Sequence, residues 1–202
     1  MSLLQIYGYK QLCFEVNKLK STAYDSNDAN HESHLLAIWD SLNPDDPLDN
    51  RISSSWTSIG FQGNDPKTDF RGMGILGLLN LHYFATRHPS VARSILLHSN
   101  HPTNGYPFAI TGINLTNMAY VLLNDGKLKT HFFNTISGTQ NIPDFHKLYC
   151  YLFVNFDRLW LKAKPKNVME FSYIKQMFLE QLDSQLAEEH CKLIWQPALD
   201  IV

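Results

Sequence analysis

The stretch MGILGLLNLHYFATRH, residues 73–88, is the longest strongly apolar run of the chain and decides the fold. Its apolar side chains surround the axis of a 3.6-residue period almost completely, which predicts a buried central helix rather than a helix at the surface. Pro89 should end this helix, because proline cannot continue the hydrogen-bonded ladder, and SVARSILLHS (90–99) should begin a short second one. A buried central helix must be surrounded by other elements, so the rest of the chain is expected to supply the helices that pack around it.

Helical spacing also dominates outside this run. Residues 145–160 carry the cleanest amphipathic stripe, and Pro165 should stop that helix. Further helices are predicted over 3–20, 34–42, 108–125 and 127–134, with a last one carrying the apolar residues from Phe171 to Leu186. No segment alternates like a strand, and no repeat of fixed period is present. The sequence predicts one compact all-α domain of about seven to nine helices.

Composition excludes several function classes. The chain has 202 residues, 44% of them hydrophobic, and a net charge of -2, so it carries no basic footprint for nucleic acid. It has no run of about 18 apolar residues that could span a membrane, and its first residues do not resemble a signal peptide. Cys13, Cys150 and Cys191 are odd in number and widely spaced, so we expect reduced core cysteines and a cytoplasmic protein.

The candidate site is DPKTDFRGMG, residues 65–74, just before the central helix. Residues 62–72 are predicted to form an ordered loop, because glycine and proline divide this polar segment. Arg71 falls near the start of the helix, where the helix dipole opposes a cation, so its position needs a reason. One reading is a salt bridge to Asp65 or Asp69 that braces the loop. The other is presentation of the guanidinium to the phosphates of a partner. The two are compatible.

Other groups of residues in the sequence do not indicate a functional site. The pairs His31 with His34, His98 with His101 and His146 with Cys150 lack the further ligands of a zinc site, so no metal site is predicted. The chain has no P-loop, and its serines lack the context of a nucleophile elbow.

The segment WTSIGFQGNDPKTDFRGMGILGLLNLHYF, residues 56–84, closely resembles the signature of the ELMO domain of the short ELMO domain-containing proteins. The resemblance continues in GYPFAITGINLTNMAYVLL (105–123), in FHKLYCYLFVNFDRLW (145–160), and in two segments upstream of the signature. It spans almost the whole chain. We therefore expect a single ELMO domain over 1–202, with an N-terminal helical part (1–50), a signature core (51–165) and a C-terminal helix (166–202). The N-terminal extension of some members is expected to be missing.

The resemblance implies a function. Members of this family act as GTPase-activating proteins for Arf and Arf-like small GTPases, and their proposed catalytic arginine corresponds to Arg71. Longer ELMO relatives, which act as scaffolds, generally lack it. The family motif implies that six further residues orient the loop or bind the partner: Gln62, Asp65, Thr68, Asp69, Gly72 and Gly74. The two glycines could also let the GTPase approach closely. Trp56, Ile59 and Phe61 should anchor the loop to the core.

On this reading the chain needs no cofactor and catalyses no reaction of its own, because GTP and Mg²⁺ arrive with the GTP-bound GTPase. Any association with organelle membranes should be peripheral and through that partner. The alternative is a non-catalytic helical adaptor that binds small GTPases or other proteins through the same surface. An exposed, weakly paired Arg71 favours the first reading, and a buried, fully paired one favours the second.

Overall fold

The computed structural model describes residues 2–196, and every regular element within them is a helix. The all-α prediction is confirmed. Met1 and residues 197–202 of the predicted domain lie outside the described residues. The α-helices are α1 (Leu3–Ser21), α2 (Ala29–Leu42), α3 (Gly74–Arg87), α4 (Pro89–Ser99), α5 (Phe108–Asn124), α6 (Lys129–Thr135), α7 (Ile142–Ala163) and α8 (Phe171–Leu186). Three short 3₁₀ helices are η1 (Ser54–Ile59), η2 (Pro66–Gly72) and η3 (Val168–Glu170).

Helix α3 lies at the centre, as predicted. It packs against α1, α2, α4, α5 and α7, and its buried side chains include Leu76, Leu81 and Phe84. His88 separates α3 from α4, and Pro89 opens the second helix, where its missing N–H costs nothing. A helix with neighbours on most sides needs the nearly continuous apolar surface that its sequence shows.

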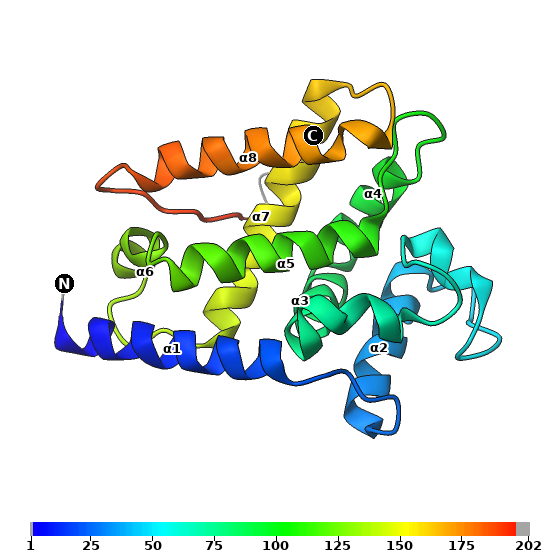
Figure 1. Cartoon of the computed structure of the whole chain (residues 1–202), viewed down its shortest axis with the longest axis horizontal. Coiled ribbons are helices and arrows are strands. Elements are labelled where there is room, and N and C mark those ends of the chain that lie inside the picture. Colours follow the sequence, from blue (N-terminus) through cyan, green and yellow to red (C-terminus); the bar gives the residue numbers. More distant parts are fainter. Residues whose placement is uncertain (1, 197–202) are drawn as a thin grey trace.

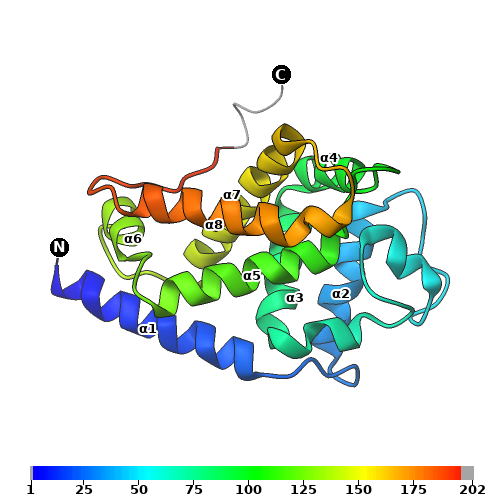
Figure 2. The ribbon, with the colours of Figure 1, turned by 45° about the horizontal axis from the view of Figure 1, so that its top comes forward.

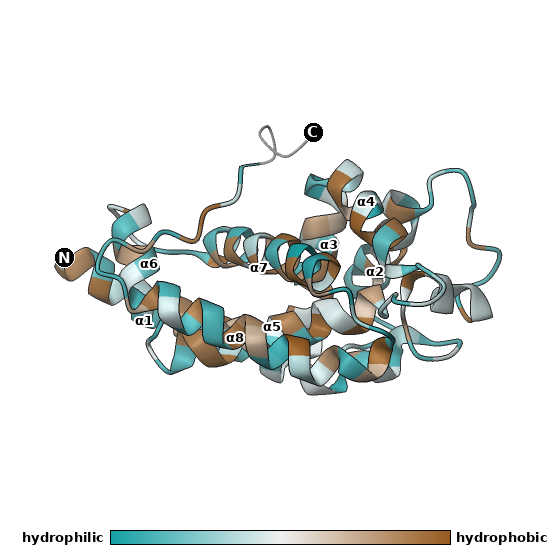
Figure 3. Cartoon of the chain, turned by 90° about the horizontal axis from the view of Figure 1, so that it is seen from above, coloured by the Kyte–Doolittle hydropathy of each residue, from teal (hydrophilic) through white to brown (hydrophobic). Residues whose placement is uncertain are grey.

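Helix α7 supplies the second half of the core. A capping box between Asn141 and Asp144 starts it, and its stripe from Phe145 to Trp160 is buried. Figures 1 and 2 show α7 crossing behind α5 and α8, with α1 beside α5. In Figure 3, brown and teal segments alternate along α5, α7 and α8, as expected for helices buried on one face.

Large aromatic side chains hold the helices together. Trp39, Trp56, Phe84 and Trp160 are all buried, as their size predicts. All three of these indoles also donate hydrogen bonds to the backbone: Trp39 Nε1 to Asp46 O at 2.7 Å, Trp56 Nε1 to Arg51 O at 2.9 Å and Trp160 Nε1 to Asn104 O at 2.7 Å. Each indole thereby satisfies its one polar group inside the core.

Among its described residues, the last predicted part contains the short η3 and the helix α8. Beyond it, residues 191–196 are irregular and return across α6, where the Leu193 backbone N–H donates to His131 Nδ1 at 3.0 Å. Cys150 and Cys191 are free and buried, as predicted, whereas Cys13 is only half-buried. No helix within residues 2–196 combines the length and the apolar character needed to cross a bilayer.

Candidate functional site

Arg71 lies near the end of η2 and is exposed. Its Nε donates to the Thr68 carbonyl oxygen at 3.0 Å, one turn earlier on the same short helix. Within the described part of the chain it forms no ion pair. The salt bridge to Asp65 or Asp69, one of the two readings of the sequence, is therefore not formed. The Nε–Thr68 bond fixes the stem of the guanidinium while its two terminal nitrogens remain available to a partner.

Asp65 is engaged elsewhere. Its Oδ1 accepts from the Lys67 backbone N–H at 3.0 Å, which caps the start of η2, and from Arg51 Nη1 at 3.0 Å. Pro66 occupies the first turn of η2, where the backbone needs no donor. Asp65 thus orients the segment that carries Arg71 instead of pairing with it.

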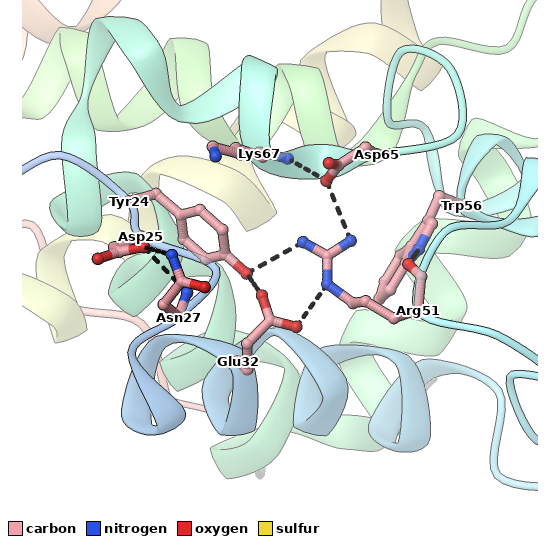
Figure 4. Close-up of polar contacts among 8 residues, drawn as sticks. All are labelled: Tyr24, Asp25, Asn27, Glu32, Arg51, Trp56, Asp65 and Lys67. Carbon is pink, nitrogen blue, oxygen red and sulfur yellow. Dashed lines mark hydrogen bonds and ion pairs between the residues drawn. The ribbon is translucent and has the colours of Figure 1, made fainter.

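Arg51 is the centre of a polar cluster with Tyr24, Glu32 and Asp65, drawn in Figure 4. Its Nε donates to Glu32 Oε2 at 2.5 Å and its Nη2 to the Tyr24 hydroxyl oxygen at 3.2 Å. The Tyr24 hydroxyl in turn donates to Glu32 Oε1. These contacts join the α1–α2 connection, α2 and the start of η2.

The pKa values in this cluster follow from burial and hydrogen bonding. Burial acts to lower the pKa of Arg51, but the hydrogen bonds to Glu32 and Tyr24 raise it more, so the net shift is upward. Burial and the bond to Glu32 raise the pKa of Tyr24 above its ordinary value. Arg51 is therefore a permanent cation and Tyr24 a neutral donor, as the drawn bonds require.

Arg51, Tyr24 and Glu32 were not among the residues predicted for the site. They lie 8 to 27 positions apart in the chain, so no local spacing connects them. The sequence held one indirect signal for this cluster. A second arginine, Arg51, lies 14 positions before Asp65 and could compete with Arg71 for that carboxylate.

The Asp69 side chain connects the two ends of the loop 62–69. Its Oδ2 accepts from the Gln62 backbone N–H at 2.8 Å. Burial raises the pKa of Asp69, whereas the Gln62 bond and the charge of Arg71 act to lower it. Gln62 and Thr68 are themselves exposed, and each contributes a backbone group to the loop: Gln62 its N–H and Thr68 its carbonyl.

Aromatic rings anchor the loop beneath Arg71. Phe70 is buried, stacks on Tyr24 with ring centroids 5.4 Å apart, and meets Phe61 edge-on at 5.7 Å. Phe61 in turn meets Trp56 at 5.7 Å. Trp56, Ile59 and Phe61 are buried, which confirms them as anchors. The neighbour of Arg71 in sequence is thus fixed in the core while Arg71 projects outward.

The two glycines that follow Arg71 differ. A Cβ on Gly72 would meet no atom within 4 Å, so this position is open at the surface. Gly74 is buried with φ +53°, and a Cβ there would lie 2.3 Å from the Thr22 carbonyl oxygen and 2.4 Å from that of Lys20. The close approach at Gly74 is made by the end of α1, so this glycine orients the loop within the fold. Among the two, Gly72 alone is open to another molecule.

A pocket of about 410 Å³ adjoins Arg71, between the end of α1 and η2. Lys20, Lys67 and Arg71 are its cationic residues, and no acidic residue lines it. Phosphate or carboxylate groups of a partner would meet positive charge here. A larger pocket of about 500 Å³, between α1 and the α5–α6 turn, contains none of the predicted site residues.

Two of the histidines from the predicted pairs, His98 and His146, lie beside polar side chains of the domain. Among residues 2–196, no three His, Cys, Asp or Glu side chains gather as metal ligands would. Burial lowers the pKa of His146 to about 4, and its Nδ1 lies 2.7 Å from Asn80 Oδ1. His98 Nδ1 lies 2.8 Å from Asp157 Oδ2, and the Tyr106 hydroxyl donates to the other oxygen of that carboxylate at 2.6 Å.

The chain is similar to known proteins over most of its length. It is 50% identical over 186 residues to ELMO domain-containing protein 2 of Mus musculus, covering 92% of this chain and 64% of that protein. It is 44% identical over 201 residues to ELMO domain-containing protein 1 of Mus musculus, covering 91% and 62%. ELMO domain-containing protein B of Dictyostelium discoideum is 45% identical over 163 residues, covering 81% and 56%. The chain thus spans less than two thirds of the length of these curated relatives.

No solved structure matches the chain. The model of the ELMO/CED-12 family matches residues 14–175, a range that contains α2 to α7, both 3₁₀ helices of the site, and Arg71. On this match and these identities, the chain belongs to the ELMO/CED-12 family.

Proposed function

We propose that this domain stimulates GTP hydrolysis by an Arf or Arf-like small GTPase, and that Arg71 is the arginine it supplies. The observation that carries the proposal is the state of Arg71: exposed, held through Nε by the Thr68 carbonyl, and without an ion pair among residues 2–196. Family membership supports a small GTPase as the partner, because it agrees with what the signature motif implies.

The chemistry gives an arginine of this kind a direct use. GTP hydrolysis is slow because negative charge developing on the phosphoryl oxygens is poorly stabilised. An arginine supplied in trans accelerates the step by about 10³–10⁵-fold, or roughly 4–7 kcal/mol of barrier. A guanidinium suits the role because its planar fork donates to two oxygens at once and stays charged. An arginine already paired with a carboxylate would first have to lose that partner.

The surroundings of Arg71 are preorganised. The Arg51–Asp65 ion pair, the Asp69–Gln62 bond and the buried Phe70 ring hold η2 against the core. A donor that is fixed before the reaction needs no reorganisation in the transition state. Lys20 and Lys67 beside Arg71 would favour approach of the phosphates, and the open surface at Gly72 would permit close contact.

The remaining parts of the proposal concern the partner. GTP and Mg²⁺ would be held by the GTPase, in its GTP-bound state, with no cofactor on this chain. The domain would act in the cytoplasm and reach organelle membranes peripherally, where its partner resides.

The test is single-turnover GTP hydrolysis by a panel of Arf-family GTPases with this domain in saturating excess. At least one GTPase should be accelerated by wild-type domain. Arg71→Lys should lose roughly 100-fold or more of that acceleration while binding to the GTP-bound GTPase changes little, because lysine keeps the charge but not the fork. Arg93→Lys, at another exposed arginine, is the matched control and should behave as wild type.

Two results would overturn the proposal. Full acceleration by an equally stable Arg71→Lys variant would show that Arg71 is not the catalytic group. Binding to GTP-loaded GTPases without any acceleration by wild-type domain would favour the non-catalytic adaptor instead.

A further inference from the structure

The connection between α7 and α8 carries a charge unlike the rest of the chain. Residues 158–176 contain five lysine or arginine residues and one acid, Glu170, whereas the remaining residues contain twelve basic and eighteen acidic ones. Leu161 to Tyr173, here named the α7–α8 corner, lies at the top edge of the molecule in Figure 1. A basic corner on a net acidic chain indicates a partner of negative charge.

The lysines of the corner are not neutralised within the domain. Lys162, Lys164 and Lys166 are exposed, and none of them forms an ion pair within residues 2–196. Glu170, the one acid nearby, directs Oε1 to the backbone N–H of Lys166 at 3.1 Å. Its carboxylate therefore serves the turn and leaves the three ammonium groups uncompensated.

Apolar side chains project from the same corner. Met169 is 85% exposed and Tyr173 67%, and Leu161 and Val168 are also exposed. Met169 and Tyr173 are four residues apart across the continuous η3–α8 segment, so they lie on one side of it. Phe171 and Ile174, between and after them, turn inward to the core. Met169 and Tyr173 thus form an exposed face at the start of α8, separate from the face that packs against the core.

Caps, hydrogen bonds and a buried proline fix the backbone of the corner, and its apolar side chains face solvent. Lys164 ends α7 in the left-handed region, φ +50°, and its N–H donates to the Trp160 carbonyl at 3.2 Å. Pro165 is buried, and the Asn167 side chain accepts from the Met169 N–H at 2.9 Å. A mobile loop could fold its apolar groups back on the domain, whereas this capped turn keeps them exposed.

We propose that the α7–α8 corner binds the surface of an anionic lipid bilayer. The three lysines would lie among the acidic headgroups, and Met169, Tyr173 and Val168 would enter the interfacial layer. Lysines around exposed apolar and tyrosine side chains are the combination that peripheral membrane surfaces use. A protruding corner suits a flat bilayer, whereas a small acidic peptide is usually received in a groove. The proposal needs no GTPase and is independent of the proposed function.

The test is co-sedimentation of the purified 202-residue chain with vesicles of phosphatidylcholine, with and without phosphatidylserine. Wild-type chain should bind the phosphatidylserine vesicles only, and binding should weaken as salt rises. The variant Lys162→Gln/Lys164→Gln/Lys166→Gln should lose on the order of 100-fold in partitioning, since each lysine near an anionic surface contributes measurably. Met169→Ser/Tyr173→Ser should also weaken binding, and its loss should persist at high salt.

A matched control separates the corner from net charge. Lys10, Lys18 and Lys192 are exposed elsewhere, and changing all three to glutamine alters the net charge by the same amount. This control should bind vesicles as wild type does. Equal losses in both triple variants would show that only net charge matters and would overturn the proposal. So would a wild-type chain that ignores the vesicles, including one that instead binds an oligoglutamate peptide through the corner lysines.

Discussion

Replacing Arg51 with alanine should destabilise the domain by about 2–3 kcal/mol, although Asp65 is the one predicted site residue that its side chain bonds to among residues 2–196. The guanidinium binds Glu32, Asp65 and Tyr24, at 2.5, 3.0 and 3.2 Å. Its removal leaves two carboxylates without their cation at the junction of α2 and η2.

The magnitude follows from how far water reaches the cluster. Breaking a fully buried ion pair costs about 3–5 kcal/mol, and breaking an exposed one about 0–1 kcal/mol. The side chains of Arg51, Glu32 and Asp65 are 24%, 20% and 34% exposed, which places the cluster between these limits.

Urea unfolding at neutral pH measures the effect as a shift of the midpoint at unchanged slope. Arg93→Ala, at an exposed arginine whose one side-chain bond goes to the Ser41 carbonyl, is the control and should cost about 0.5 kcal/mol or less. In a Glu32→Gln background, Arg51→Ala should cost less, because one of its partners is already neutral. A loss of under about 0.5 kcal/mol for Arg51→Ala in the wild-type background would refute the argument that this cluster braces η2.

Three further predictions concern the core and its titration. Trp160→Ala should cost about 3–5 kcal/mol in urea unfolding, because the indole is fully buried, and an unchanged midpoint would contradict this. Gly74→Ala should destabilise by more than about 1 kcal/mol and Gly72→Ala by less than about 0.5 kcal/mol, because of these two glycines Gly74 alone combines a positive φ with backbone atoms where the Cβ would lie. Burial lowers the pKa of His131 and of His146 from 6.5 to about 4, so the unfolded state binds more protons between these values. The free energy of unfolding should keep its full value above about pH 6.5. It should fall toward pH 4 by up to about 1.4 kcal/mol per pH unit for each histidine, and urea midpoints that stay level over this range would contradict the prediction.

The helices could be predicted because their signals are local. The apolar run of 73–88, the stripe of 145–160 and the stop at Pro89 depend on neighbours within a few residues, and the structure confirms all three. The 3₁₀ helix η2 lies in the segment 62–72, which was expected only as ordered loop, and η1 was not predicted. Such short turns leave no periodic pattern, and tertiary contacts of Trp56 and Phe70 stabilise them.

The candidate site was predictable as a segment and not as a set of contacts. The motif singled out Arg71, and the glycines and proline around it indicated ordered backbone. The partners of Asp65 could not be predicted, because Arg51, Tyr24 and Glu32 meet only after α1, α2 and η2 pack. The contacts of Gly74 could not be predicted for the same reason: the backbone that approaches it belongs to the end of α1, some fifty residues earlier in the chain.

The two arginines of this region show why the placement of Arg71 is informative. Arg51 is half-buried, and its guanidinium bonds to three side chains of this domain, so its charge is neutralised within the fold. Asp65 is taken by Arg51 and by the cap of η2, and Asp69 by the Gln62 N–H. Both acids that the sequence offers to Arg71 therefore have other partners. If the arginine served only to brace the loop, it could pair with Asp69, whose pKa its charge already acts to lower. Arg71 instead forms no ion pair among residues 2–196, on a segment that other contacts brace, and this supports the proposal that it acts on another molecule.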